Sequence, residues 1–109
     1  MNTRHYSDKQ EKSVAKTLCG HKNANSGATP FIKGDIQLKN FLIECKTVTQ
    51  KKSSVTIKEE WLTKLKKEAF SMNKPYNMLA FNFGPGEKNF YILDENLICY
   101  IIELLNKED

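Results

Sequence analysis

Two acidic residues and one lysine are spaced so that a β-hairpin would bring them together. Asp35 and Glu44 lie at the open end of a segment that fits a hairpin, with Lys39 and Asn40 as its turn. In such a hairpin Asp35 stands directly opposite Glu44, and side-chain alternation puts Lys46 on the same face. Opposed carboxylates repel each other and need a neutralising group, which a hard cation such as Mg²⁺ supplies well. The spacing therefore predicts a metal site with a lysine at its edge.

The same residues also fit a simpler interpretation. An acid followed by Glu-x-Lys is common on exposed strands, where Glu44 and Lys46 would form an ordinary solvated face. Leu42 shares that face in the predicted hairpin, and a leucine there favours a half-buried face. Cys45 points to the opposite face and is expected to be a small core residue. Both interpretations stay open from spacing alone.

The positive charge is concentrated in the half of the chain that holds the hairpin. Residues 1–58 contain eleven Lys or Arg against four acids, whereas residues 59–109 contain six against nine. A positive field around a carboxylate pair is expected of a protein that attracts a polyanion and hydrolyses it with metal. A chain that is merely rich in lysine gives the same imbalance without that function.

The composition is that of an ordinary globular protein. With 109 residues, 39% of them hydrophobic and 28% charged, we expect a single domain spanning residues 1–109. No apolar stretch reaches the length of a membrane span, and the first six residues hold no apolar signal-peptide core. We therefore expect a cytoplasmic protein without a membrane partner. Three scattered cysteines and no Cys-x-x-Cys motif argue against a zinc ribbon or a disulfide framework.

The elements that would position these residues alternate between helices and strands. A helix between the third and fourth strands favours a crossover connection and a mixed sheet. The prediction is an α/β fold, a mixed five-stranded sheet flanked by helices in the order αβββαββα. The predicted elements are a helix at 7–18, hairpin strands at 34–38 and 41–46, a strand at 54–57, a helix at 58–71, strands at 76–83 and 89–93, and a helix from 94 to about 106.

The first helix turns a carboxylate towards its apolar side. Ser7 and Gln10 form a weak capping box at its start. Glu11 lies three and four residues before Val14 and Ala15, so it shares their apolar stripe. A boundary glutamate that reaches water, or one paired with a nearby lysine, explains the same pattern.

The other two helices differ in how much of their surface is apolar. The second is expected to start at a capping box from Thr56 to Glu59. The third, capped by Asp94, is apolar on more than one face. The apolar residues beyond those needed for one buried face predict a subunit interface or a covered sheet edge, unless the whole helix packs in the core. The buried stripe of the second helix is predicted to hold Trp61, Leu62, Leu65 and Ala69.

The layout and the motif residues together resemble the PD-(D/E)XK nuclease superfamily, and within it the archaeal-type Holliday-junction resolvases. The superfamily core has the order αβββαβ, with an acid entering one hairpin strand and Glu-x-Lys on the next. These resolvases add a glutamate in the first helix and a Ser-Gly loop. The resemblance covers residues 7–93, with Gly34 where the family name has proline, and its strength lies in the order of the motifs. The matching residues are Glu11, Ser26-Gly27, Gly34-Asp35, Glu44-Cys45-Lys46 and Thr47.

The resemblance implies a restriction-endonuclease-like fold and metal-dependent hydrolysis of DNA phosphodiester bonds. Asp35 and Glu44 would hold Mg²⁺ or Mn²⁺, with the backbone carbonyl of Cys45 as a third protein ligand. Glu11 would touch the metal directly or through water. Lys46 would orient the attacking water or neutralise the developing charge.

The expected partner is DNA, with no nucleotide cofactor. Ser26 would contact the scissile phosphate, unless it is an ordinary loop serine. Symmetric nicking of a four-way junction needs two sites, so the first expectation is a homodimeric resolvase. The alternatives are the same nuclease acting on flaps, branched replication intermediates or plain duplex, and a DNA-binding protein without turnover, against which the intact acid and lysine set counts. The residues expected to bind phosphates are Lys33, Lys51 and Lys52.

Overall fold

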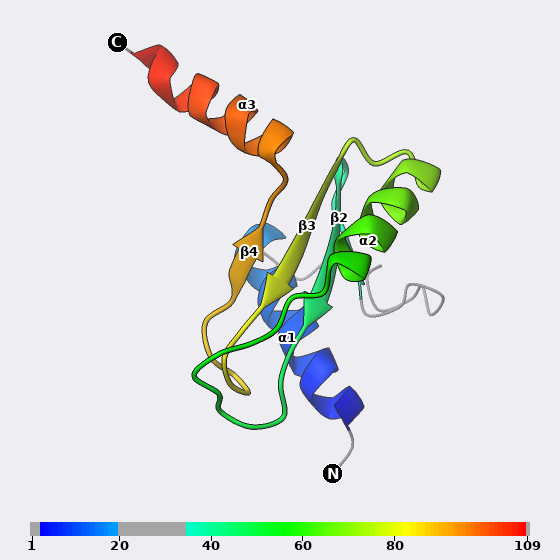
Figure 1. Ribbon diagram of the computed structural model, residues 1–109, viewed down its shortest axis with the longest axis vertical. Helices are drawn as coiled ribbons and strands as arrows, with labels where there is room; N and C mark the ends of the chain where they lie inside the picture. Colours follow the sequence, from blue (N-terminus) through cyan, green and yellow to red (C-terminus); the bar gives the residue numbers. More distant parts are fainter. Residues whose placement is uncertain (1–2, 20–34, 109) are drawn as a thin grey trace.

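The computed structural model describes residues 3–19 and 35–108, and within these ranges the side chains at positions 3, 4, 19, 35 and 108 are not described. Helices and strands alternate along the chain (Figure 1). In order, the elements are α1 (Thr3–Cys19), β1 (Asp35–Gln37), β2 (Phe41–Lys46), α2 (Glu59–Ser71), β3 (Tyr76–Phe81), β4 (Phe90–Ile92), α3 (Glu95–Leu105) and the 3-10 turn η2 (Asn106–Glu108).

The strands form one mixed sheet in the order β1-β2-β3-β4. The outer pairs β1·β2 and β3·β4 are antiparallel, and the central pair β2·β3 is parallel. Helix α2 connects the two parallel strands, because parallel neighbours need a crossover connection. The α/β class, the mixed sheet and the crossover are therefore confirmed.

The prediction of five strands is wrong for the described part of the chain, where four are found. The segment 54–57 is not a strand, although Val55 and Ile57 are half-buried. Strands β2 and β3 already have neighbours on both sides, so the segment has no central edge to pair with. It lies instead in the long loop between β2 and α2, which a hydrogen bond from Lys52 N to Phe83 O (2.8 Å) ties to the chain after β3.

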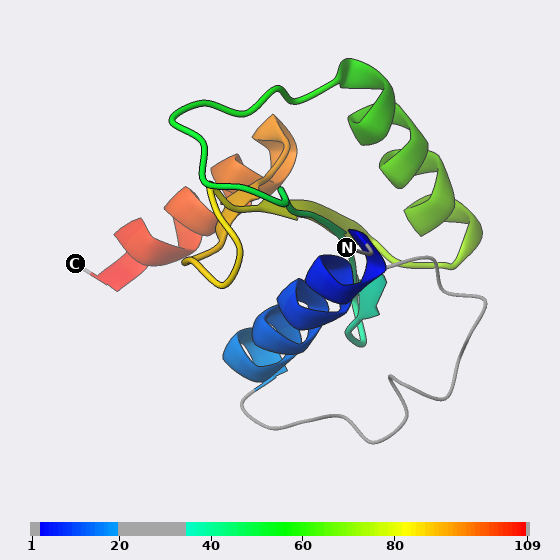
Figure 2. The same cartoon turned by 90° about the horizontal axis from the view of Figure 1, so that it is seen from below.

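Two layers of apolar side chains hold the helices to the sheet. Figure 2 shows α1 on one face of the sheet and α2 on the other. Strand alternation separates neighbouring residues of β2 between these layers, so Ile43 faces α1 and Leu42 faces α2. The buried residues on the α1 face are Val14, Ala15, Ile36, Ile43 and Ala80. Those on the α2 face are Leu42, Leu65, Ala69 and Leu79, with Trp61 and Leu62 packed against them as the predicted stripe requires.

Two of the three predicted helix caps are wrong. Helix α1 begins at Thr3, four residues early, because no proline or glycine interrupts the chain before Ser7. Helix α2 begins at Glu59 with Lys58 as its N-cap and without a side-chain cap, so Thr56 does not cap it. The predicted cap of α3 is confirmed, because the Asp94 side chain accepts a hydrogen bond from Leu97 N at 2.9 Å.

Helix α3 extends away from the sheet (Figure 1). Leu97 is its buried residue, close to the cap. Further along, the described elements leave its apolar side chains exposed, so the alternative that the whole helix packs in the core is wrong, and the predicted apolar surplus is present. The exposed residues are Ile98, Tyr100, Ile102, Leu104 and Leu105.

None of the described helices combines the length and the apolar character needed to cross a membrane.

Candidate functional site

The hairpin has the register that the sequence predicts. Asp35 pairs with Glu44, Ile36 with Ile43 and Gln37 with Leu42. Because opposed residues share a face of the sheet, the positions of both acids lie on the α2 face. Local alternation within ten residues determines this register, which explains why sequence reasoning could find it.

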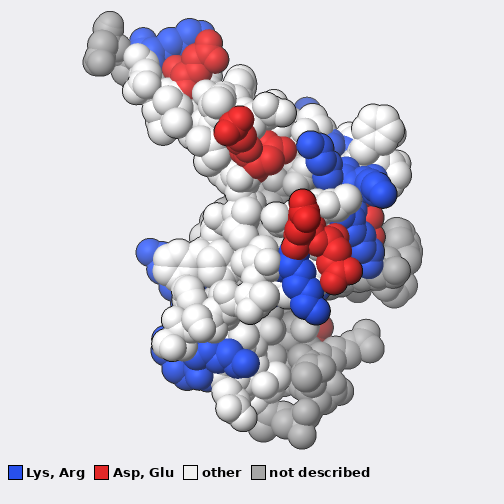
Figure 3. Space-filling model, viewed as in Figure 1, with Lys and Arg blue, Asp and Glu red and all other residues white. Residues whose placement is uncertain are grey.

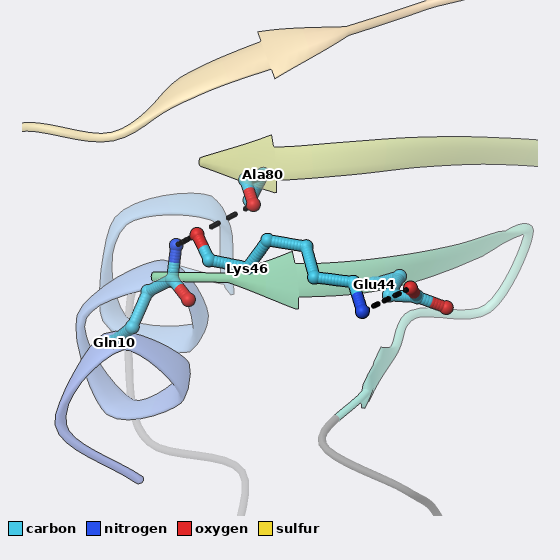
Figure 4. A network of polar contacts seen from close by, with 4 residues as sticks. All are labelled: Gln10, Glu44, Lys46 and Ala80. Carbon is cyan, nitrogen blue, oxygen red and sulfur yellow. Dashed lines mark hydrogen bonds and ion pairs between the residues drawn. The ribbon is translucent and has the colours of Figure 1, made fainter. Parts of the chain in front are cut away.

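The glutamate of the pair is shielded and ion-paired. The Glu44 side chain is 13% exposed, and its Oε2 lies 3.4 Å from Nζ of Lys46, as Figure 4 shows. Leu42, two residues earlier on the same face, is fully buried. The face is therefore half-buried, as the position of Leu42 predicts, and a fully solvated face does not describe Glu44.

Trp61 on α2 contacts the same lysine. Nζ of Lys46 lies 4.4 Å from the centroid of the Trp61 ring, and Nζ of Lys58 lies 5.9 Å from it. A cation at such distances over an indole is attracted to the negative face of the ring. The Lys46 ammonium is thus placed between a carboxylate and an aromatic face. The sequence predicted Trp61 only as a residue of the buried stripe, not as part of the site.

Gln10 holds the backbone of Lys46 from the other side of the sheet (Figure 4). Its Nε2 donates to Lys46 O at 2.7 Å and more weakly to Ala80 O at 3.4 Å. It also lies 3.2 Å from Oδ1 of Asn89. The side chain is 4% exposed. The predicted capping role of Gln10 is therefore wrong, and the residue bridges α1 to the ends of β2 and β3.

A chain of polar side chains continues from Gln10 around the ends of the strands. Oγ1 of Thr47 donates to Oδ1 of Asn82 at 2.9 Å. Asn82, which is 2% exposed, donates to Asn89 at 3.4 Å, and Asn89 donates to Oγ of Ser13 at 3.3 Å. Buried polar groups need such partners, so the network fixes the end of β2 where Lys46 lies.

Glu11 lies on a different side of the sheet from the acid pair. It is half-buried on α1, which covers the face opposite to that of Glu44. The inward position over the end of β2 is occupied by Gln10 instead. The arrangement of the elements therefore does not bring Glu11 to the face that carries Glu44 and Lys46.

The remaining predicted residues have different surroundings. Ser26 and Lys33 lie outside the described residues. Lys51 is on the surface and pairs with Glu87 at 2.7 Å. Lys52 lines a pocket together with Lys46. Of the lysines predicted to bind phosphate, Lys52 is therefore the one that the described structure places next to the site.

Cys45 packs against the core on the α1 face, as predicted. It is half-buried there and neighbours Tyr91 of β4. Burial raises the pKa of the Tyr91 hydroxyl, and repulsion from a charged Cys45 adds to the shift. The cysteine side chain thus has a structural place on the face away from Glu44, which leaves only its backbone carbonyl for a role at the site.

The donor groups of the site fit a hard cation in their chemistry. Among the described side chains, no three His, Cys, Asp or Glu residues are grouped to hold a metal ion, and the side chain of Asp35 is outside that set. The pairing of the two acid positions and the shielding of Glu44 match the carboxylate donors that Mg²⁺ and Mn²⁺ bind. Lys46 is the cation that balances Glu44 in this structure.

Comparison with known proteins finds no matching family model, no matching curated protein and no matching solved structure. The resemblance to resolvases therefore rests on the motif residues and on the order of elements around them.

Proposed function

We propose that this protein is a metal-dependent DNA endonuclease of the PD-(D/E)XK type, with Asp35, Glu44 and Lys46 as its catalytic set. The observation that carries the proposal is the register that pairs Asp35 with Glu44, next to a lysine held at 3.4 Å from Glu44. A shielded glutamate whose strand partner is an aspartate is costly in a purely structural role, because like charges at opposed positions repel each other. The basic first half of the chain supports an anionic substrate.

Each residue of the set has a distinct task in phosphodiester hydrolysis. Asp35 and Glu44 hold Mg²⁺ or Mn²⁺, with the carbonyl of Cys45 as the third protein ligand that the resemblance implies. When bound, a divalent cation supplies Lewis-acid polarisation of the phosphate and a more acidic water. Lys46, positioned by Glu44 and Trp61, donates from its ammonium to the attacking water or to the phosphate oxygens as negative charge develops.

Two residues implied by the resemblance have a smaller place in this proposal. Helix α1 covers the opposite face of the sheet, so we assign Glu11 a contact through water rather than a direct bond to the metal. Ser26 keeps the role of contacting the scissile phosphate. Neither is needed for the core of the proposal, which rests on the hairpin.

The substrate we propose is branched DNA, with a four-way junction as the first candidate and a homodimer as the acting form. The exposed apolar side chains of α3 support a second copy as partner, since a large uncovered apolar surface marks an interaction site. Two sites related by a two-fold axis would then address two strands of a junction. The alternative substrate is a flap or plain duplex cut by the same site.

The first test is a cleavage assay with labelled four-way junction, flap and linear duplex in Mg²⁺, Mn²⁺ or EDTA. We expect cleavage only with metal. Asp35→Asn and Glu44→Gln should abolish it while leaving DNA binding intact or tighter, because each removes negative charge next to a phosphate. Glu60→Gln, an exposed acid on α2, is the matched control and should cut normally.

The assay also separates the competing functions. Undiminished cleavage by Asp35→Asn or Glu44→Gln, or by the wild type in excess EDTA, would contradict the assignment of the site. Tight junction binding with no cleavage in any metal would instead favour a DNA-binding protein that keeps the fold without turnover.

A further inference from the structure

A pocket opens beside Lys46 on the α2 face of the sheet, and Lys46 is the one residue of its described lining that takes part in the proposed chemistry. Its volume is about 350 Å³, at the lower end of the roughly 300–1,000 Å³ typical of small-molecule sites. It lies between the end of β2, the loop that follows, the first turn of α2 and the end of β3. The residues that line it include Lys46, Lys52, Ser54, Thr56, Trp61 and Phe81.

The lining combines cations and hydroxyl groups with an aromatic wall. Lys46 and Lys52 contribute two ammonium groups, and Ser54 and Thr56 contribute hydroxyl donors. None of the described residues that line the pocket is Asp or Glu, and because Lys46 is paired with Glu44, the net positive charge of the lining comes from Lys52. Figure 3 shows Lys or Arg side chains gathered over the loop below the sheet. Positive and hydroxylic groups suit a phosphate, and an aromatic ring suits a planar base.

The size of the pocket selects among nucleic-acid ligands. A volume of about 350 Å³ suits one nucleotide rather than a base pair. A base inside a duplex is stacked on both sides and cannot reach a protein ring, whereas an unpaired base can leave the stack and lie on an aromatic side chain. The Trp61 ring is half-buried and carries the Lys46 ammonium on its face. A base that enters the pocket packs against the part of the Trp61 ring that this ammonium leaves uncovered, so Lys46 keeps its contacts with Glu44 and Trp61.

We propose that this pocket binds one unpaired nucleotide of the DNA strand that is cut, with its base against Trp61 and its phosphate at Lys52. The proposal rests on the proposed nuclease function and narrows its substrate class. Because Lys46 belongs both to the pocket and to the catalytic set, the bound nucleotide neighbours the scissile phosphate. Branch points and flaps contain such nucleotides, whereas a fully paired duplex does not.

The experiment uses the fact that Trp61 is the only tryptophan in the chain. Its fluorescence therefore reports on the pocket directly. The full-length protein is titrated in EDTA with a single-stranded oligothymidylate and with a duplex of the same length, so that no cleavage interferes. We expect the single strand to change the emission of Trp61 and the duplex to change it much less. A single strand that binds without any change in emission would overturn the proposal.

Two variants locate the base and the phosphate. Trp61→Leu should weaken the binding of a labelled single strand, measured by anisotropy, by about 5- to 150-fold, the range equivalent to base–aromatic stacking. Trp61→Phe keeps an aromatic ring and should recover most of that affinity. Lys52→Ala should weaken single-strand binding, whereas Lys64→Ala on the exposed side of α2 should not. Equal losses for Lys52→Ala and Lys64→Ala would refute the phosphate position, even if the Trp61 variants proved unstable.

The outcomes separate this proposal from the nuclease function on which it rests. Metal-dependent cleavage without a change in Trp61 emission would refute nucleotide binding in the pocket and leave the nuclease function in place. The protein could instead cut no DNA and still show a change in Trp61 emission that depends on Lys52. That result would support a single-strand binding site in the pocket and refute the nuclease function.

Discussion

Lys46 is held in place by three different kinds of contact. Glu44 attracts its ammonium at 3.4 Å, the Trp61 ring lies 4.4 Å below it, and Gln10 donates to its backbone carbonyl at 2.7 Å. An exposed lysine loses considerable side-chain entropy when it is fixed in one geometry. With three partners around it, Lys46 is fixed before a substrate arrives, which favours a role that depends on position over one that depends on charge alone.

We predict that Lys46→Ala lowers turnover by orders of magnitude and changes DNA affinity little. Removal of the ammonium takes away a donor that acts on the attacking water or on the developing charge. If Lys46 only bound phosphate, its replacement by alanine would instead reduce the affinity for DNA and lower the salt dependence of binding by about one unit. Single-turnover cleavage at saturating DNA distinguishes the two cases, with Lys64→Ala as the control. Normal turnover of Lys46→Ala under these conditions would contradict the catalytic role.

The site residues that the sequence could predict are those joined by local geometry. Asp35, Glu44 and Lys46 follow from strand alternation within one hairpin, and the structure has that register. The contacts of Gln10 with Lys46 and Ala80 join residues that lie 36 and 70 positions apart in the chain, so no local sequence pattern indicates them. Trp61 contacts Lys46 only because the crossover lays α2 over β2. Long-range placement of this kind depends on how whole elements pack.

Helix α1 illustrates that a stripe predicted from spacing can miss a buried polar residue. Val14 and Ala15 are buried as the stripe predicts, and Glu11 beside them is half-buried. In the structure Gln10 occupies the inward position at 4% exposure, one residue or about 100° around the helix. Propensity and periodicity gave the existence and type of the helices correctly. They did not give the start of α1, or the absence of a strand at 54–57, because those depend on free sheet edges and tertiary contacts.

We predict that Gln10→Ala reduces the free energy of unfolding by about 1–3 kcal/mol. The change removes the donor shared by the carbonyl of Lys46 and the side chain of Asn89, both of which are partly buried. The lower part of the range is expected, because Oε1 of Gln10 has no hydrogen-bond partner among the described residues and its burial already carries a cost.

Urea unfolding followed by circular dichroism measures the effect of Gln10→Ala. The control is Lys12→Ala, an exposed position on the same helix, which should stay within about 0.5 kcal/mol of the wild type. Equal stability of the two variants would mean that the polar network does not hold α1 to the ends of the strands.

The whole molecule is elongated because its last helix extends beyond the sheet. Its principal extents are 50 × 34 × 28 Å, and its radius of gyration of 14.5 Å exceeds the roughly 13 Å of a compact chain of about 100 residues. Figure 3 shows mostly uncharged surface along α3 between charged side chains near its two ends. The sequence predicted the apolar surplus of this helix. It did not show that the helix would stand away from the sheet, since the same pattern fits a buried helix.

We predict a homodimer that assembles through α3. Ile98, Ile102 and Leu105 recur at helical spacing, are exposed by 38%, 51% and 71%, and would be covered by the same face of a second copy. Ile102→Glu places a charge in that interface without disturbing the core, so it should convert the dimer to a monomer. Light scattering at micromolar concentration measures the change, and Glu103→Gln on the same helix is the control.

The predicted dimer would have a consequence for substrate choice that a monomer lacks. Two sites related by a two-fold axis would meet opposite strands of a four-way junction at once, and contacts to phosphates would then select shape rather than base sequence. We therefore expect the wild type to prefer a junction over duplex of equal length in a competition assay, and to cut paired strands together. Ile102→Glu should lose the preference and release singly nicked junctions, while its metal-dependent chemistry persists because α3 lies apart from Glu44. If the wild type is a monomer with equal affinity for junction and duplex, the proposed resolvase function is wrong. The proposal of a general nuclease would remain, because its site lies within one chain.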